Sequence, residues 1–539
     1  MDVDRRWFHA HAALLGVACV LAVATGAAAQ QPAPTAIPSG PLSLEQVLDL
    51  AAARSEGIGI AEAGIRRAVG GETRAKSDLF PQLSLSAGYD RALASEFSGI
   101  FNNVAGGGSN GSGSAGGGDT ATTDFSKLPF GRANTWRVSL AFSQNLYSGG
   151  RVGLQRQLAS QGHETAEQGL TTARAQLFFD ATQAYYDAAL ADRLVSIAEA
   201  TVQQASATLD QIQAGFDAGS QPEFEVLRAR VNRDNQRPVL IRQRMNRDIA
   251  VLRLKQMLDL PAEADIRLAD ALGDETLAPP PVFAARVTAV EQALVTAGRA
   301  TLTSLNSGVA QPNRVVVTQA ETTVRQRETS VNLTEAARKP TVSLNSTYTR
   351  LAYPANDTFP LFDRSNWTVG ASLQLPILTG GRQKGDEQVA KADLDDARLR
   401  LQQMRELAAV DTQSAWAQLL AARAAWEASA GTVQQATRAY DIADVRYRNG
   451  VSTQLELTDS RLLLQQAEAN QAVAARDLQV ARARVALLPD LPLSTAGSGT
   501  TAQPPAQPTA PQAPSQQQPA TRSVTTAAST ATQGQTGTR

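Results

Sequence analysis

The sequence has few of the side chains that carry covalent and metal chemistry. Its 539 residues include one cysteine and three histidines, and aromatic residues make up only 5%. Cys19, His9 and His11 lie in the first 30 residues, a segment with the pattern of an export signal. A mature chain would keep only His163, so we expect no disulfide, no Cys/His zinc site and no thiol nucleophile. The sequence therefore predicts a protein without a cofactor or a catalytic site.

An excess of charge of one sign is also missing. The chain has 50 Lys+Arg and 51 Asp+Glu, a formal net charge of −1. Nucleic-acid binding draws most of its affinity from positive charge near phosphates, so we expect no nucleic-acid partner. The chain is also too long for one ordinary core and too poor in aromatic residues for compact globular packing.

The first 29 residues have the pattern of a signal peptide. Two arginines precede an apolar run over residues 12–23, and three small alanines end at Ala29. A transmembrane anchor would need about 20 apolar residues, more than this run provides. A lipoprotein signal with acylated Cys19 is an alternative, but four more residues of the apolar run follow that cysteine. We expect cleavage after Ala29 and a polar lead over residues 30–41.

Two parts of the chain repeat one pattern. The segment FPQLSLSAGYDR, which contains Pro81, matches KPTVSLNSTYTR, which contains Pro340. Farther along, WRVSLAFSQNLYSGGR matches WTVGASLQLPILTGGR. The first copy is longer because it holds the tract NNVAGGGSNGSGSAGGGD, a composition typical of a flexible surface loop. The sequence therefore indicates a duplicated unit over residues 42–260 and 285–488.

Each copy has two segments in which apolar and polar residues alternate, as they do in half-buried strands. We predict β-hairpins over residues 82–146 and 341–378. An aromatic residue lies at the loop end of each strand: Tyr89, Trp136, Tyr348 and Trp367. Strands of about ten residues with such ends are typical of outer-membrane barrels, so we interpret these four as membrane-interface residues. A soluble hairpin with one wet face has the same alternation and is the alternative.

After each hairpin, Gly-Gly-Arg precedes a change of period from two to about 3.5, which indicates a coiled-coil-like helix. The stretch from Arg382 to Tyr447 would form a helix about 100 Å long. Turns containing Gly219 and Gly450 then reverse the chain. We predict long helix pairs over residues 151–258 and 382–488. The Pro/Gln/Thr-rich tail over residues 489–539 is predicted to be disordered.

Four strands per chain are too few to close a membrane barrel, for which about eight are needed. Open sheet edges in lipid would leave backbone groups without hydrogen-bond partners. Two copies would give eight strands, whose side chains fill the interior, and three would give twelve, which can leave a lumen. Strands in a membrane therefore require an oligomer, and a passage favours a trimer.

The repeated unit resembles the TolC-type outer-membrane efflux proteins. The resemblance covers about residues 42–488 and is carried by the duplicated unit, the GGR joints, the YRNGVST turn and the FPQLSLSAGY strand. It implies a mainly α fold with a membrane β-barrel part: a homotrimer with a 12-stranded barrel in the lipid of the cell outer membrane and a long α-helical tunnel in the periplasm. It also implies two partners, a periplasmic adaptor protein and an inner-membrane pump of the RND, ABC or MFS type. Such proteins are passive ducts for efflux or type I secretion and catalyse no reaction.

The resemblance assigns a gate to the second helix tip. Tyr447 matches the family's tip tyrosine, and Glu456 and Asp459 match its aperture acids, one helical turn apart. The counterparts of these acids in the first copy are Glu225 and Arg228. Threefold symmetry would make each acid a ring of three, a constriction that favours cations. Without the family match, a pair of solvated helix acids would be the simpler interpretation.

Ser452 departs from the family pattern, in which an arginine at this place helps to hold the tip shut. We expect Arg228 or Arg448 to take over that role. The family's adaptor-contact positions correspond to the two turns: Gly219, Ser220, Gln221, Pro222, Gly450, Val451, Ser452 and Thr453. Their simplest role, which they must perform in any case, is to reverse the helices.

A function from another class also fits the long helices. A periplasmic coiled-coil adaptor or scaffold without a membrane channel would have two such hairpins. It would leave the alternating, aromatic-ended strands without a purpose, and nothing in the chain resembles a lipoyl-like domain. A channel is therefore the function that the sequence favours.

Overall fold

The computed structural model describes residues 40–93, 134–269, 272, 277–296, 313–353, 362 and 364–494. The predicted signal peptide, most of the polar lead, the Gly/Ser/Asn loop and the tail beyond residue 494 lie outside the described residues. Among the helices that are described, none has both the length and the apolar composition needed to cross a membrane.

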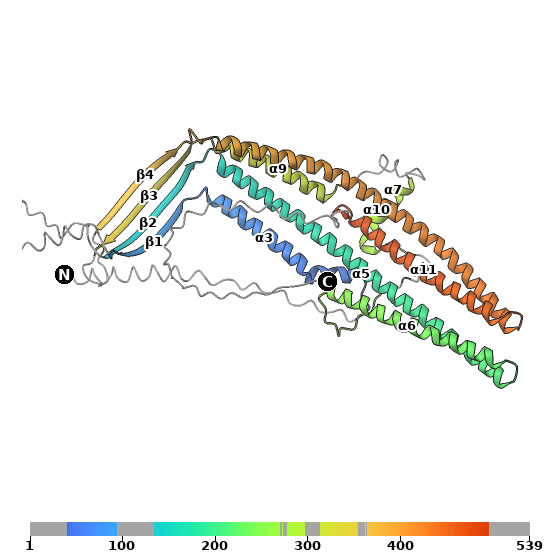
Figure 1. The fold of residues 1–539 in the computed structure, drawn as a ribbon. Coiled ribbons are helices and arrows are strands. Elements are labelled where there is room, and N and C mark those ends of the chain that lie inside the picture. Colours follow the sequence, from blue (N-terminus) through green and yellow to red (C-terminus); the bar gives the residue numbers. More distant parts are fainter. Residues whose placement is uncertain are drawn as a thin grey trace, which may run out of the picture. The chain divides into compact units, whose positions relative to one another are not determined.

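The fold is mainly helical, and the order of its main elements in the first half recurs in the second (Figure 1). The first half consists of α2 (Leu44–Arg54), α3 (Glu56–Ser77), β1 (Gln82–Arg91), β2 (Asn134–Tyr147), α5 (Arg151–Asp217) and α6 (Glu223–Met257). The second consists of η2 (Pro281–Phe283), α7 (Ala284–Thr296), α9 (Val315–Ala336), β3 (Thr341–Ala352), β4 (Arg364–Gln374), α10 (Arg382–Arg448) and α11 (Gln454–Leu487). Each half has one helix of 67 residues and a returning helix of 35 or 34 residues.

The two hairpins lie side by side in one antiparallel sheet with the strand order β1-β2-β3-β4 (Figure 1). The register pairs Tyr89 with Trp136, and Tyr348 with Trp367. Side chains alternate between the two faces of a strand, so the aromatic pairs share a face with apolar pairs such as Leu83 and Phe142. Strands β1 and β4 are the edges of this sheet.

Paired glycines make the joint between each hairpin and the helix that follows. Gly149 and Gly150 have φ values of 64° and 88° before α5, and Gly380 and Gly381 have values of 60° and 89° before α10. These left-handed conformations turn the chain sharply out of the strand, and glycine adopts them without a steric penalty. A Cβ atom at Gly149 would also lie 2.6 Å from the Cβ of Lys339, so side-chain bulk is excluded there.

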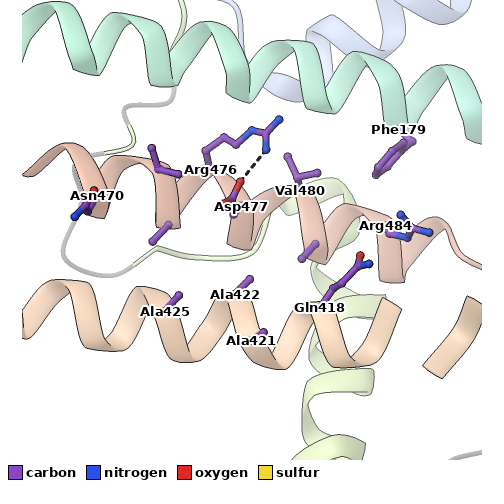
Figure 2. A pocket seen from close by; sticks show the side chains of 13 residues that line it. Phe179, Gln418, Ala421, Ala422, Ala425, Asn470, Arg476, Asp477, Val480 and Arg484 are labelled. Atoms are coloured by element: carbon purple, nitrogen blue, oxygen red, sulfur yellow. Dashed lines mark hydrogen bonds and ion pairs between the residues drawn. The ribbon is translucent and has the colours of Figure 1, made fainter. Parts of the chain in front are cut away.

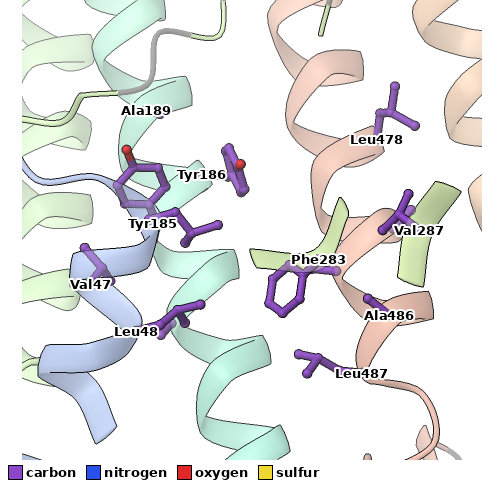
Figure 3. Packing of buried hydrophobic residues seen from close by; sticks show 14 of the residues in the cluster. Val47, Leu48, Tyr185, Tyr186, Ala189, Phe283, Val287, Leu478, Ala486 and Leu487 are labelled. Carbon is purple, nitrogen blue, oxygen red and sulfur yellow. The ribbon is translucent and has the colours of Figure 1, made fainter. Parts of the chain in front are cut away.

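The main apolar core is formed by residues of α2, α5, α6, α10, α11 and the η2–α7 segment (Figure 3). Tyr185 of α5 is fully buried in this core, and its hydroxyl donates a hydrogen bond of 3.2 Å to the carbonyl of Leu42. Phe283 and Val287 belong to the same cluster as Leu487 of α11. The core thus joins the first and second halves of the chain, because it takes side chains from both.

The start of the predicted disordered tail needs a correction. Residues 489–494 are packed against the helices, with the side chains of Leu491 and Leu493 buried. The carbonyl of Pro489 accepts a hydrogen bond of 2.8 Å from the amide of Val315, at the first residue of α9. The two leucines supply enough apolar area to order a segment whose composition is otherwise polar.

Candidate functional site at the helix tips

The turn between α5 and α6 is a compact helix reversal. Gly219 has a φ of 75°, and the amide of Ser220 donates a hydrogen bond of 2.8 Å to the carbonyl of Gly215. This bond from the second residue past the helix end to its last turn is that of a Schellman motif. The hydroxyl of Ser220 donates to the same carbonyl at 2.9 Å. Gln221 and Pro222 then lead into α6, and both are exposed.

The turn between α10 and α11 has the same geometry. Gly450 has a φ of 72°, and the amide of Val451 donates a hydrogen bond of 2.9 Å to the carbonyl of Arg446. Thr453 caps α11, because its hydroxyl accepts a bond of 3.4 Å from the amide of Glu456. The two turns therefore present similar exposed backbones, and the side chain of Val451 is 69% exposed at the second one.

The acids predicted at the second tip have different surroundings. The carboxylate of Glu456 lies 2.8 Å from the guanidinium of Arg446, across the turn between the helices. Asp459 lies one turn farther along α11, is exposed, and forms no ion pair with another described residue. One predicted acid is thus neutralised by a neighbour, whereas the other keeps its charge exposed to solvent.

The ion pair at this tip is formed by Arg446, and the expectation that Arg228 or Arg448 helps to hold the tip shut stays a prediction. Arg448 pairs instead with Asp444, one turn back on its own helix, at 2.8 Å. Arg228 is half-buried and has no ion-pair partner among the described residues. Arg446 precedes the tip glycine Gly450 by four residues and Glu456 follows it by six, on different helices, so no helix-face spacing in the sequence links the two side chains.

Tyr447 connects the two tips. Its ring packs against a buried cluster formed by Leu209, Ile212, Val226 and Ala229 of α5 and α6. Burial raises the pKa of the Tyr447 hydroxyl, and the negative charge of Glu225 raises it further. The structure therefore brings together the predicted gate residues Tyr447 and Glu225.

Three polar side-chain atoms at the tips are buried without hydrogen bonds to described residues. They are one carboxylate oxygen of Glu225, the hydroxyl of Ser452 and the amide oxygen of Gln454. Buried polar atoms usually find a partner. Ser452 therefore forms no bond that replaces the arginine expected at its place.

A cavity of about 600 Å³ lies between α10 and α11, away from the tips (Figure 2). Its lining is dominated by small residues, including Ala421, Ala422 and Ala425 of α10. Of its three charged side chains, Arg476 lies 2.7 Å from Asp477, and Arg484 pairs with Asp411 at 3.1 Å. This lining has neither histidine nor cysteine, and its one acidic side chain is already paired.

The same fold occurs in outer membrane channels of known structure. The Campylobacter jejuni CmeC outer membrane channel matches with a TM-score of 0.62 and 16% identity, over 84% of this chain and 86% of that chain. The Neisseria gonorrhoeae MtrE outer membrane channel in its open state matches with a TM-score of 0.61 and 18% identity, over 83% and 89%. The Vibrio cholerae outer membrane protein VceC matches with a TM-score of 0.60 and 17% identity, over 83% and 95%. The fold is therefore that of an outer membrane channel.

The family follows from the sequence comparison. A family model for outer membrane efflux proteins matches residues 47–259 and 307–490. A search of curated proteins gave no match. The chain belongs to the outer membrane efflux protein family, whose members are channels and not enzymes. Its location is the outer membrane, with a large helical part in the periplasm.

Proposed function

We propose that the chain is the exit duct of a tripartite efflux or type I secretion system. In this proposal three copies form a passive channel that is gated at its periplasmic helix tips. The observation that carries it is the combination, in one chain, of an open four-stranded sheet and two helices of 67 residues. A duct from the periplasm through the outer membrane needs both parts.

The sheet supports a trimer. Strands β1 and β4 are its edges, so their outer backbone groups have no sheet partner within one chain. In lipid these groups must be paired, and pairing β4 of one copy with β1 of the next would do so. Three copies would close a barrel of twelve strands, which is wide enough for a lumen. Eight strands from a dimer would be filled by their own side chains.

The helices support the same assembly. Helix α6 exposes a row of large apolar side chains: Phe224, Leu227, Val231, Ile241, Met245, Ile249 and Leu252. Several members of this row are three, four or seven residues apart, the spacing of a helix face that packs against other helices. A neighbouring copy would cover this row and complete a helical tunnel.

The gate in this proposal consists of Tyr447, Glu225, Glu456 and Asp459. Tyr447 holds the α10–α11 tip to the α5–α6 tip through its contact with the buried cluster. Three copies of Glu456 and Asp459 would form rings of negative charge that favour cations. The ion pair with Arg446 lowers the net charge of the Glu456 ring, so Asp459 would contribute most of the field.

The exposed turns are the proposed docking positions for a periplasmic adaptor, which would connect the duct to an RND, ABC or MFS pump. Val451 and Phe224 are 69% and 68% exposed at or beside these turns. Exposed apolar side chains at a turn are suited to packing against the helical hairpin of a partner. Either turn would offer such a contact.

Fractionation followed by crosslinking tests the proposal. A channel should migrate as a heat-modifiable trimer from the outer-membrane fraction, whereas a periplasmic scaffold would remain soluble. The only cysteine is Cys19, in the predicted signal peptide, so variants with a cysteine at Ser220 or Ser452 would carry one mature thiol. These variants should crosslink to a co-expressed adaptor, and a cysteine at exposed Gln402 of α10 is the control. Crosslinking from Gln402 alone would contradict docking at the tips.

A further inference from the structure

One face of the four-stranded sheet is apolar across both hairpins. The strand register places its side chains in cross-strand pairs, such as Leu83 with Phe142, Leu85 with Leu140 and Val342 with Leu373. The opposite face carries hydroxyl and amide side chains, including the bonded pair Ser343 and Ser372 at 2.7 Å. A barrel strand in a membrane turns its apolar face to the lipid.

Two arginines interrupt the apolar face, at equivalent positions of the two hairpins. Arg91 follows Tyr89 by two residues in β1, and Arg350 follows Tyr348 by two residues in β3. Because side chains alternate along a strand, each arginine shares the apolar face with the tyrosine that precedes it. Both arginines are exposed. They lie toward the loop ends of the strands, away from the helices.

At the same end of the sheet, the opposite face carries charges of both signs. There Arg137 of β2 lies 3.9 Å from the carboxylate of Asp90 of β1, so positive and negative charges occur together. Within the described part of the chain, Arg91 and Arg350 have neither an ion-pair partner nor a side-chain hydrogen bond. Among the described residues, the apolar face therefore carries two positive charges without a carboxylate partner. The polar face carries the Arg137–Asp90 pair and Arg364, whose guanidinium lies over the ring of Tyr353.

We propose that Arg91 and Arg350 bind phosphate groups of the outer-leaflet lipids that surround the barrel. This inference rests on the proposed function, which turns the apolar face to lipid and the loop ends to the cell exterior. Tyrosine and tryptophan rings lie at the headgroup level of a membrane, so an arginine beyond them reaches the phosphates. A guanidinium binds phosphate through two parallel N–H bonds, which a lone ammonium cannot do.

Because the hairpin is duplicated, each chain has two such arginine sites. Each chain carries the Tyr-x-Arg arrangement twice, so a trimer would present six arginines around its outer rim. The long side chain of arginine can also extend along the barrel surface toward the headgroups while its apolar stem stays on the lipid face. Anionic lipid would then form a bound belt at the level of the aromatic residues.

Native mass spectrometry of the detergent-solubilised full chain tests the proposal. The probes are lipid A with both phosphate groups and the same lipid after removal of both. The wild-type protein should retain the phosphorylated lipid about tenfold more strongly, the effect of one or two charge-assisted bonds. The double variant Arg91→Gln, Arg350→Gln should lose this preference. Equal retention of the two lipids by the wild-type protein would overturn the proposal.

Two further variants test which residues are responsible. Arg137→Gln removes the same charge at the same end of the sheet but on the polar face, so the phosphate preference should remain. The double variant Arg91→Lys, Arg350→Lys keeps the charge without the paired N–H geometry and should keep part of the preference. Loss of the preference in Arg137→Gln, or its full retention in the double Gln variant, would contradict the assignment.

The lipid site and the proposed function can fail separately. Heat-modifiable trimers in the outer-membrane fraction and channel conductance report on the duct, and lipid retention reports on the arginines. A conducting trimer without phosphate preference would contradict the lipid site alone. A chain that stays soluble and forms no trimer would contradict the duct, and the lipid site with it.

Discussion

Arg446, in the last turn of α10, lies 2.8 Å from Glu456, in the first turn of α11, so this ion pair spans the tip between the two helices. Both side chains are about half exposed, with relative exposures of 48% and 40%. Exposed pairs of this kind contribute about 0–1 kcal/mol to stability. The pair therefore matters more for the charge of the tip than for holding it together.

Removal of Arg446 should make the channel more cation-selective. Arg446→Gln leaves the charge of Glu456 uncompensated. The interaction energy between two unit charges about 4 Å apart in water is about 1 kcal/mol. We expect the cation-to-anion permeability ratio to rise about fivefold, since 1.4 kcal/mol corresponds to tenfold. The double variant Glu456→Gln, Asp459→Asn should lower the same ratio. Reversal potentials in planar bilayers measure both effects.

The control for this prediction is Arg423→Gln. Arg423 pairs with Glu427 on α10 at 2.9 Å, well away from the tip. Its loss should leave selectivity close to that of the wild-type channel. A shift as large as that of Arg446→Gln would show that overall charge, and not the tip pair, sets the selectivity.

Tyr447 should act through its ring and not through its hydroxyl. Tyr447→Ala removes the contact with Leu209 and Ile212 and should loosen the tips, at a cost of about 2 kcal/mol for a partly buried aromatic side chain. We expect a higher single-channel conductance and greater sensitivity of cells to large antibiotics. Tyr447→Phe should behave like the wild type. If both variants opened the channel equally, a hydrogen bond of the hydroxyl would be the closing element.

Asp411 should be essential for stability. Its carboxylate is buried on α10, 3.0 Å from Arg314 and 3.1 Å from Arg484, and it accepts a hydrogen bond from Ser494. Asp411→Asn leaves buried guanidinium charge without its partner, which costs about 3–5 kcal/mol. Urea unfolding of the detergent-solubilised protein measures this loss. Asp395→Asn, an exposed position on the same helix, should change stability by less than about 0.5 kcal/mol.

The same carboxylate should make stability depend on acid. Burial by itself raises the pKa of Asp411, but the hydrogen bonds from Ser494 and Arg314, together with the nearby arginine charges, outweigh it and hold the pKa below its usual range. A lowered pKa in the folded state stabilises the protein above the unfolded-state pKa of about 3.9, and this stabilisation is lost as the pH falls. Unfolding free energies below about pH 4 should therefore fall less steeply in Asp411→Asn.

The two glycine joints should differ in their tolerance of alanine. Gly380→Ala meets no atom within 4 Å and should cost only the left-handed backbone conformation, about 1–2 kcal/mol. Gly149→Ala has the same backbone cost and also places its Cβ 2.6 Å from that of Lys339, so we expect a loss of about 3 kcal/mol or more. Thermal unfolding of the two variants compares the losses directly. Equal losses would mean that the β2–α5 joint shifts freely to accept the methyl group.

Periodicity was sufficient to predict the long elements. The sequence predicts a helix from Arg382 to Tyr447, and α10 spans Arg382–Arg448, because a repeat sustained over many turns outweighs local noise. The contact of Tyr447 with Leu209 could not be predicted, since it depends on how two hairpins distant in sequence pack together. The Arg446–Glu456 pair could not be predicted either, because the turn geometry, and not a helix face, brings the two side chains together.

Average composition also does not show where the folded part of the chain ends. The segment after Leu488 is polar on average, and averaging hides the two buried leucines, Leu491 and Leu493. The sequence also does not show that the carboxylate of Asp411 is buried and accepts hydrogen bonds from distant residues. Its partners Arg314 and Ser494 are 97 and 83 residues away in the sequence.

Truncation should place the end of the folded part after Ser494. A chain that stops there keeps the Ser494 bond to Asp411, the carbonyl of Leu491 that accepts from Arg314, and the burial of Leu493. A chain that stops after Leu488 loses all three. The burial of each leucine contributes about 1.5–3 kcal/mol, so the shorter chain should be less stable by several kcal/mol.

Trimer yield and urea unfolding distinguish the two truncations. We expect the chain ending at Ser494 to match the full chain and the chain ending at Leu488 to give few trimers. The double variant Leu491→Ala, Leu493→Ala in the full chain separates burial from chain length, because it removes the apolar side chains and keeps both polar contacts. If the truncation after Leu488 were as stable as that after Ser494, residues 489–494 would not be part of the folded protein in solution. The carboxylate of Asp411 would then need another hydrogen-bond donor in place of Ser494.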